Sequence, residues 1–415
     1  MPKERIILLI PNIEYGGAQK SFVSLANELS HIYEVIVCVF YIPEKFGYKL
    51  NDNVEIVELD NSTSDNLFGK GVNFFKRLNR LNEIISSYSV EIVVSFLEGA
   101  NYINCLSKAN NKIISIRGSI FSDQTITGVV GLARKYFLMP LLYPMAKSII
   151  VVNEGIKNEL RKFKFISTNK IKVIVNFYDS EKIEDSSLLP KPAGFGQLYD
   201  KSKILVTVGR LAPEKGYNYL LEIFNEFSVK NSVYKLVIVG DGAQKTELIN
   251  HAEYLFGKEN VWHSEHEKDY RSIKERKVFF IGYSDNPYKW MKSAKAYLLT
   301  STSEGYPNVL RESMIVGTPV ISSDCPDGPR HMLSDNCIMS DSNDYPEIYS
   351  RGVLLDAFKP DDVNAKAKIK SWVDGLEKVL GDENLLGRIS SSGKEWSQTL
   401  SKEKIIDLWL QVIKK

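Results

Sequence analysis

The feature that most constrains this chain is an alternation of short apolar runs with amphipathic segments, which occurs twice along its 415 residues. In the first half, residues 18–30 and 73–88 repeat apolar side chains at i, i+3 and i+4, as helices do. The β-rich runs around them predict strands buried on both faces, at residues 5–10, 33–40, 54–60, 91–96, 112–117, 148–153 and 170–179. Buried strands separated by helices predict a parallel sheet covered by helices on both sides.

A polar stretch containing Pro and Gly follows at residues 180–200, and the alternation then restarts. The second half predicts strands at 203–210, 235–242, 277–283, 295–301 and 318–324, with helical patterns between them. We therefore predict an α/β protein of two doubly wound, Rossmann-like domains that face each other across a cleft. The predicted parts are an N-terminal domain (1–182), a linker (183–202), a C-terminal domain (203–396) and a final helix (397–415) packing back on the N-terminal domain.

Composition and charge exclude several classes of function. The net charge of +2 creates no field that attracts nucleic acid, so no nucleic-acid partner is expected. The four cysteines form no CxxC pair, which favours a reducing, cytoplasmic compartment. The longest apolar region, residues 137–152, is interrupted by Pro140, Pro144 and Lys147 and is shorter than the roughly 18 residues that span a bilayer. We expect no membrane-spanning segment.

Two glycines, Gly16 and Gly17, lie between the predicted strand 5–10 and the helix 18–30. One interpretation is mechanical, because glycine adopts positive φ and forms tight turns easily. The other is chemical, because a loop without Cβ atoms lets a phosphate or a sugar approach the N–H groups of a helix N-terminus. The glycine pair alone is compatible with both.

Charged residues follow two of the predicted strands in the second half. Arg210 and Lys215 follow the apolar run KILVTV, where they are either ordinary surface cations or a clamp for a diphosphate. Glu304 follows the strand at 295–301, and Glu312 lies eight residues further on, about two helical turns along. This pair is either a surface pair or two carboxylates that reach separate hydroxyl-bearing parts of one ligand. The intervening N–H groups of Asn308, Val309 and Leu310 are predicted to point at the same site.

These segments resemble a known family. VGRLAPEKG (208–216), EGYPNVLRE (304–312) and GGAQ (16–19) look like the signature segments of the family 4 glycosyltransferases, which have the GT-B architecture. The resemblance extends over nearly the whole chain and is best at 5–30, 203–242 and 278–331. In addition, SSDCPDGPRHML (322–333) resembles a subgroup whose usual members make bacterial surface polysaccharides or glycans from UDP-sugars.

The resemblance implies a retaining transferase that moves a hexose or N-acetylhexosamine from a UDP-sugar to a growing, lipid-linked glycan. It implies no metal and no other cofactor. Carried over residue by residue, it assigns the donor phosphates to Gly16 and Gly17, the leaving diphosphate to Arg210 and Lys215, the donor sugar to Glu304, the ribose hydroxyls to Glu312, and the surroundings of the base to Gly282 and Tyr283.

The sequence departs from the family pattern at two positions. Many members have a His after the fifth strand, where this chain has Arg117. Because arginine does not act as a base at ordinary pH, Arg117 is expected either to bind an acceptor or donor group or to be a plain surface residue. His331 follows Arg330 at a position where Glu is commoner.

Three further segments have more than one interpretation. Residues 134–147 combine three cations with aromatic and aliphatic side chains, which fits either a core helix or contact with anionic lipid headgroups. The polar segments 257–277 and 334–352 interrupt the alternation and are interpreted as insertions. His263 and His266 lie in the first of them among Glu265 and Glu267, and a solvated loop is favoured over a metal site.

Other functions remain compatible with the same two-domain pattern. A sugar-nucleotide epimerase would use a similar scaffold, and a catalytically silent module would use the cleft only to bind. The two cations and the Glu304-x7-Glu312 spacing favour the transferase.

Overall fold

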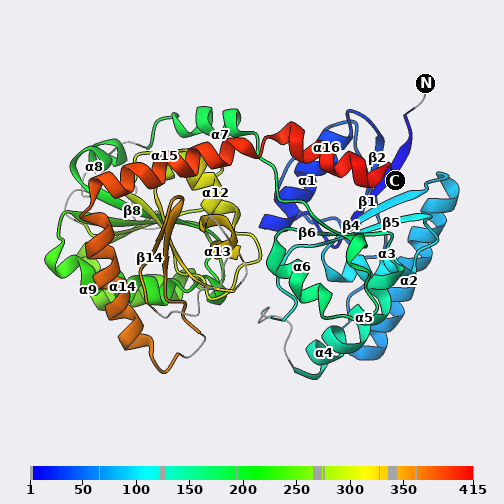
Figure 1. The fold of residues 1–415 in the computed structure, drawn as a ribbon, viewed down its shortest axis with the longest axis horizontal. Coiled ribbons are helices and arrows are strands. Elements are labelled where there is room, and N and C mark those ends of the chain that lie inside the picture. The colour runs from blue at the N-terminus through cyan, green and yellow to red at the C-terminus, as the bar shows by residue number, and fades with distance from the viewer. Residues whose placement is uncertain are drawn as a thin grey trace. The chain divides into compact units, whose positions relative to one another are not determined.

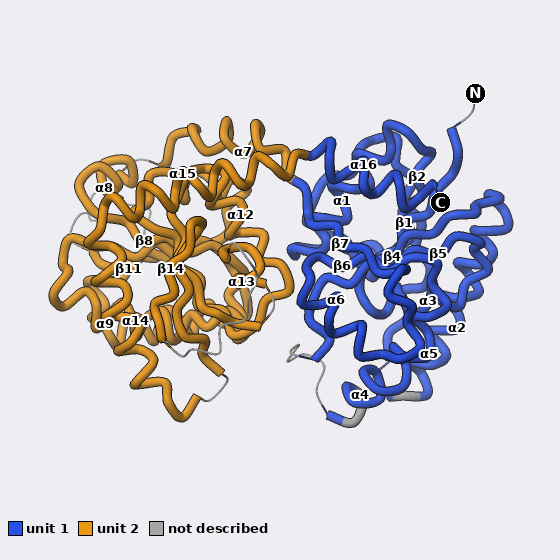
Figure 2. Tube along the Cα trace, viewed as in Figure 1, with its two compact units in different colours: residues 1–177, 402–415 blue, residues 178–401 orange. Residues whose placement is uncertain are grey.

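The computed structural model describes residues 3–64, 66–121, 128–192, 194–264, 273, 276–326, 328–334, 344–359 and 362–414. The chain divides into two compact units, one formed by residues 1–177 with 402–415 and the other by residues 178–401 (Figure 2). Each unit is built on its own largely parallel sheet with helices against it (Figure 1). The predicted fold class, α/β with two doubly wound sheets, is therefore confirmed.

The first unit contains a parallel sheet in the order β3-β2-β1-β4-β5-β6-β7. Its strands are β1 (Arg5–Ile10), β2 (Glu34–Val39), β3 (Glu55–Glu58), β4 (Ile92–Phe96), β5 (Asn111–Ile116), β6 (Ser148–Val151) and β7 (Ile171–Val173). Its helical elements are α1 (Gly17–Leu29), α2 (Leu67–Ser87), α3 (Glu98–Leu106), α4 (Gly128–Ala133), η1 (Arg134–Leu138), α5 (Met139–Leu142), η2 (Tyr143–Met145), α6 (Glu154–Arg161), η3 (Thr168–Lys170) and α16 (Lys402–Ile413).

Strand β1 shows why these runs are apolar throughout. Ile6, Leu8 and Ile10 point into one core, which they share with residues of α1 and α16. Ile7 and Leu9 point into a second core on the other face, which contains residues of α2 and α3. Because successive side chains of a strand point to opposite faces, a strand covered on both faces needs apolar residues at every position.

The last helix, α16, belongs to the core of the first unit, as the sequence predicted for the end of the chain. Trp409 stacks on Phe96 of β4 with ring centroids 5.9 Å apart. The side-chain amide of Asn111 donates to the carbonyl oxygen of Ile413 at 3.0 Å, and Lys402 forms a 3.2 Å ion pair with Glu28 of α1. The helix begins later than expected, because residues 397–399 are the end of α15 in the second unit.

The second unit contains an eight-stranded sheet in the order β10-β11-β9-β8-β12-β13-β15-β14, in which only β14 pairs antiparallel. Its strands are β8 (Lys203–Val208), β9 (Tyr234–Val239), β10 (Val261–His263), β11 (Val278–Gly282), β12 (Ala296–Leu299), β13 (Val320–Ser323), β14 (Glu347–Tyr349) and β15 (Gly352–Leu355).

The helical elements of the second unit cover both faces of this sheet (Figure 1). Residues of α9, α10, α14 and α15 share one core, and residues of α7, α8, α11, α12 and α13 share the other. The bounds are α7 (Ser180–Ser187), α8 (Phe195–Lys201), η4 (Pro213–Lys215), α9 (Tyr217–Lys230), α10 (Lys245–Phe256), η5 (Lys258–Asn260), α11 (Tyr288–Met291), α12 (Asn308–Ile315), α13 (Gly328–Leu333), α14 (Ala365–Leu380) and α15 (Glu383–Thr399).

The segment expected as a linker, residues 183–202, is instead part of the second unit. It contains the end of α7 and all of α8. Phe195 is buried edge-on against Trp262 and Trp290, with centroids 5.2 and 4.9 Å away. A few well-placed apolar side chains thus anchor a segment whose average composition is polar.

The two segments interpreted as insertions also contribute to the sheet. Residues 261–263 form β10, and residues 347–349 form β14, which makes a tight hairpin with β15. These strands have only three or four residues, which is too short for a periodic pattern. In the described part of the chain, no helix is both long and apolar enough to cross a membrane.

Candidate active site

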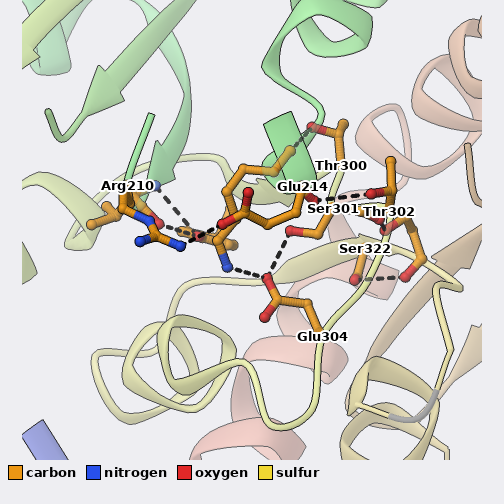
Figure 3. Close-up of polar contacts among 11 residues, drawn as sticks. Arg210, Glu214, Thr300, Ser301, Thr302, Glu304 and Ser322 are labelled. Carbon is orange, nitrogen blue, oxygen red and sulfur yellow. Dashed lines mark hydrogen bonds and ion pairs between the residues drawn. The ribbon is translucent and has the colours of Figure 1, made fainter. Parts of the chain in front are cut away.

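Strands β8, β12 and β13 are neighbours in the second sheet and run parallel, so their carboxyl ends lie at one edge. The segments that follow them begin at Gly209, Thr300 and Asp324 respectively. Most of the residues predicted to bind the donor diphosphate and sugar lie in these segments. Figure 3 shows the polar contacts that join the first two of them.

The turn after β8 is fixed by glycine and by hydroxyl groups. Gly216 has φ +65°, and a Cβ atom there would lie 2.3 Å from the carbonyl oxygen of Thr300. This position therefore requires glycine both for its backbone conformation and for space. The Thr300 hydroxyl lies 3.2 and 3.1 Å from the carbonyl oxygens of Lys215 and Gly216. The N–H of Thr302 donates to the backbone carbonyl oxygen of Glu214 at 2.9 Å. The turns after β8 and β12 thus form one rigid substructure.

Lys215 and Glu304, which were assigned to different parts of a donor, contact each other directly. The Nζ atom of Lys215 lies 2.6 Å from Oε1 of Glu304, and the Ser301 hydroxyl donates to the same oxygen at 2.7 Å (Figure 3). The Lys215 side chain is 23% exposed and that of Glu304 is 10% exposed. The interpretation of Glu304 as a surface carboxylate is therefore wrong. Ser301 was missed, although the run TSTS directly after a buried strand is a signal for hydroxyl donors.

Arg210 lies at the same edge but is more exposed, at 67%. Its guanidinium donates to Oε1 of Glu214 at 2.6 Å, within the turn that contains η4. Burial opposes the ionisation of Glu214, but hydrogen bonds within its own residue and to Arg210 outweigh burial and lower its pKa. Sequence reasoning missed Glu214 as a second carboxylate in addition to Glu304. Arg210 and Glu214 are four residues apart, and such charged pairs are common on any surface.

Helix α12 carries Glu312, whose side chain is buried at 3% exposure, so it is not a surface carboxylate either. At the start of this helix, the Tyr178 hydroxyl donates to Oδ1 of Asn308 at 2.5 Å. Burial raises the pKa of Tyr178 well above its usual value, and the nearby Glu312 charge raises it further. Tyr178 is therefore a hydrogen-bond donor at neutral pH.

One predicted donor group on α12 is not available. The N–H of Leu310 donates to the carbonyl oxygen of Pro307 at 3.0 Å, and the Leu310 side chain is fully buried in the core. The prediction for Leu310 is therefore wrong, because the first turn of this helix closes on its own backbone. That the N–H groups of Asn308 and Val309 point at the donor site stays a prediction.

Gly282 is the last residue of β11 and Tyr283 follows it, two strands away from β8 in the sheet. Gly282 has φ +79°, and its carbonyl oxygen accepts a 2.9 Å hydrogen bond from Gly240 at the end of β9. Tyr283 is half exposed. The structure places them at the carboxyl edge of the sheet, and their role near the base stays a prediction.

The glycine loop of the first unit does not need positive φ at Gly16, whose φ of 174° is extended backbone. A Cβ atom at Gly16 would lie 2.2 Å from Oε1 of Gln19, the end of a flexible side chain that can move aside, so neither backbone conformation nor space requires glycine here. The mechanical interpretation is therefore wrong for Gly16. Gly16 is the N-cap of α1, a helix of 13 residues, and Gly17 is its first residue, so the pair lies at a helix N-terminus.

Arg117 is neither a plain surface residue nor a group that extends into solvent. It lies over the Phe96 ring at 4.1 Å and the Trp409 ring at 5.8 Å, and it donates to Oδ1 of Asn176 at 2.6 Å. These contacts tie β4, β5 and α16 together. The surface interpretation is wrong, because the aromatic rings take up the face of the guanidinium.

Three cysteines are buried thiols, Cys38 and Cys105 in the first unit and Cys325 after β13. Burial raises the pKa of Cys38 and of Cys105 to about 12 and that of Cys325 still higher, so these thiols stay protonated. Among the described residues, no group of three or more His, Cys, Asp or Glu side chains is arranged to hold a metal ion. His266, Glu265 and Glu267 lie outside the described residues.

Two doubly wound units, with the candidate side chains at the carboxyl edge of the second sheet, have the GT-B fold of their structural neighbours. The Anabaena protein HepE, solved in complex with UDP-glucose, has this fold and superimposes with a TM-score of 0.69. The superposition covers 99% of both chains at 14% sequence identity and shows the fold alone.

Sequence comparison adds the family. Residues 202–354, which lie in the second unit, match the model of the family "Glycosyl transferases group 1". An uncharacterized glycosyltransferase of Methanocaldococcus jannaschii is 28% identical over 96% of both chains. An alpha-1,4-N-acetyl-D-galactosaminyltransferase of Campylobacter jejuni is 26% identical over 99% of this chain and 98% of its own. The predicted resemblance to the glycosyltransferases is confirmed, and the number of the family stays a prediction.

Proposed function

We propose that this chain transfers a hexose or an N-acetylhexosamine from a UDP-sugar to a growing, lipid-linked glycan of the bacterial surface. The observation that carries the proposal is the contact of Lys215 with Glu304 beside Arg210, at the carboxyl ends of β8 and β12. The Campylobacter relative acts, by its name, on a glycan linked through diphosphate to undecaprenol, and HepE was crystallised with UDP-glucose. Both names support a nucleotide-sugar donor and a lipid-linked acceptor here.

The physical role of these residues follows from the charges that the reaction creates. Breaking the bond between sugar and diphosphate builds negative charge on the diphosphate and positive charge on the sugar ring. Lys215 and Arg210 are cations that stabilise the first, and Glu304 is a carboxylate that orients or stabilises the second. Since the turns are already joined by Thr300 and Thr302, little reorganisation is needed when the donor binds. Two cations supply the stabilisation that a metal gives in other enzymes, so the proposed mechanism uses none.

Three further features belong to the proposal. The product keeps the anomeric configuration of the donor, as the family resemblance implies. Gly16 and Gly17 let the donor phosphates approach the start of α1. The reaction takes place on the cytoplasmic side of the membrane, where nucleotide sugars are available.

The proposal is tested by thermal unfolding of the wild type and Glu312→Ala with a panel of nucleotides and nucleotide sugars. A ligand that binds only the folded state stabilises it by about 2.7 kcal/mol at a hundred times its Kd. We expect one UDP-sugar to raise Tm clearly and Glu312→Ala to weaken that shift. Asp362→Asn, at another buried carboxylate of the same unit, is the control and should keep the shift. If no UDP compound shifts the wild type, the proposal fails.

The segment 134–147 supports contact with a membrane surface. Met139, Leu142 and Tyr143 are buried, so one side of the segment packs as a core element. Five large apolar side chains of the segment are exposed, with Phe137 at 74%: Tyr136, Phe137, Leu138, Leu141 and Met145. Arg134, Lys135 and Lys147 lie in the same stretch of chain. Apolar side chains next to cations fit an anionic bilayer, which is where a lipid-linked acceptor resides.

We expect the double variant Phe137→Glu, Leu141→Glu to lose binding to anionic vesicles. Each buried aromatic or aliphatic side chain contributes about 1.5–3 kcal/mol, so the bound fraction at limiting lipid should fall at least about tenfold. The measurement is flotation with phosphatidylcholine vesicles containing phosphatidylglycerol. Tyr254→Glu changes an exposed aromatic residue of α10 and should bind as the wild type does. A wild type that does not float with these vesicles contradicts membrane contact.

A further inference from the structure

A buried ionic cluster lies next to the candidate site, around Arg330 of α13. The side chain of Arg330 is 6% exposed, and its carboxylate partners Asp324 and Glu347 are 12% and 11% exposed. Nε of Arg330 donates to Oδ1 of Asp324 at 3.0 Å, and the terminal nitrogens donate to Oε2 and Oε1 of Glu347 at 2.8 and 2.9 Å. One planar guanidinium therefore joins the end of β13 to β14.

Two tyrosines complete the cluster from the segment that was interpreted as an insertion. The Tyr345 hydroxyl donates to Oδ2 of Asp324 at 2.8 Å. A terminal nitrogen of Arg330 donates to the Tyr349 hydroxyl at 3.0 Å, and this hydroxyl donates to Glu347. Buried ion pairs are costly to desolvate and often add little stability. A cluster of two carboxylates, one arginine and two tyrosines therefore points to a need for fixed geometry rather than for stability.

The geometry that it fixes is that of the turn carrying Glu304. Helix α13 begins at Gly328, whose N–H donates to the carbonyl oxygen of Glu304 at 3.0 Å. A Cβ atom at Gly328 would lie 2.6 Å from Cδ of Pro307 and 2.8 Å from the same carbonyl oxygen. The start of α13 is thus packed directly on the turn 304–307. Arg330 lies only two residues further along.

We propose that Arg330 is a positioning residue that, through α13, holds Glu304 where it contacts the donor sugar. The hairpin β14–β15 then has a function, because it supplies the carboxylate of Glu347 that completes the clamp. The part of the inference that concerns the sugar rests on the proposed function. The part that concerns the turn 304–307 rests on the contacts of the second unit alone.

The same hairpin region provides a matched control at the other end of α13. Nε of Arg351 donates to the carbonyl oxygen of Met332 at 2.9 Å, and Arg351 also donates to Ser334. Its guanidinium lies 5.0 Å from the ring centre of Trp396. Arg351 therefore also packs against α13, but at the end away from Gly328. A purely structural role would make the two arginines equivalent.

The first test is hydrogen exchange of the ligand-free protein, measured on Arg330→Lys and Arg351→Lys. Lysine keeps the charge but loses the planar fork that joins two carboxylates. We expect the Gly328 amide to exchange at least about tenfold faster in Arg330→Lys, because the local opening becomes easier. If Arg330→Lys does not fold, Glu347→Gln replaces it, because this variant keeps the contact of Arg330 with Asp324. It should also make the Gly328 amide exchange faster. Unchanged protection of Gly328, or equal loss in Arg351→Lys, overturns the inference.

The second test compares the affinities for UDP and for the best UDP-sugar by calorimetry. If Arg330 positions Glu304, Arg330→Lys should keep its affinity for UDP and lose about tenfold or more of its preference for the UDP-sugar, as small misplacements of a contact do. An equal loss of affinity for both ligands would indicate that the whole site is loosened, and it overturns the positioning role. A wild type that prefers no UDP-sugar over UDP contradicts the proposed function instead, and the exchange result then decides whether Arg330 holds the turn.

Discussion

Replacing Lys215 with methionine is expected to lower kcat by about a factor of 10²–10³, the usual cost of removing one preorganised group that stabilises developing negative charge. Methionine keeps much of the length of the lysine side chain, so the turn around η4 should keep its packing. The effect should appear in kcat more than in the affinity for the donor, because charge on the diphosphate develops as the bond breaks. The measurement is initial rates of UDP release at saturating donor.

The control must also remove a buried lysine from an ion pair. Lys368 lies 3.0 Å from Asp362 with 15% of its side chain exposed, which resembles Lys215 beside Glu304. It belongs to α14 and not to the turns after β8 and β12. Lys368→Met should lower stability but leave kcat of the folded enzyme within about twofold, as expected of a residue away from the reacting atoms. Equal loss of kcat in both variants would contradict a direct role for Lys215.

The second large effect concerns stability. Trp409→Ala should lower the free energy of unfolding of the first unit by about 3–5 kcal/mol, the usual cost of removing a large buried aromatic side chain. The variant removes the stacking on Phe96 and one of the two rings under Arg117. Since α16 is the last helix of the chain, the prediction also tests whether the C-terminus is a structural part of the first unit.

Hydrogen exchange with peptide resolution separates the two units in this experiment. In Trp409→Ala, protection should fall in β1, β4 and α1 and stay unchanged in β8 and β12. Trp372→Ala is the matched change in the second unit, where Trp372 is fully buried and donates to Asp356 at 2.8 Å. It should give the reverse pattern. Uniform loss of protection in both units after either substitution would show that α16 does not stabilise the first unit specifically.

The sequence was sufficient to predict the sheets because a strand covered on both faces must be apolar at every position. Ile6 to Ile10 of β1 serve two cores, as expected of a strand in a sheet covered on both faces. Some short strands were not predicted, because a few residues are too short for a recognisable pattern. Strands such as β10 and β14 have three residues each, and their pairing partners, not their composition, define them.

The site was predictable in its parts but not in its contacts. Lys215 and Glu304 are 89 positions apart, and only the parallel pairing of β8 with β12 brings them together. Leu310 and Arg117 show the limits of motif reasoning, since the N–H of Leu310 is used by its own turn and the guanidinium of Arg117 lies over the Phe96 ring and donates to Asn176. Arg330 belonged to a recognised motif, but its partner Glu347 lies in a segment that looked like an insertion.

The central claim, transfer of a sugar from a UDP donor, is tested most directly by following the sugar itself. Each radiolabelled UDP-sugar that stabilises the wild type is incubated with lipid-linked oligosaccharide extracted from bacterial membranes, and label is measured in the organic phase and on the nucleotide. We predict label in the lipid-linked fraction for the wild type and its loss in Lys215→Met. Label that stays on UDP as a different sugar would indicate an epimerase, and bound but unchanged donor would indicate a silent binding module; either result would contradict the proposed function.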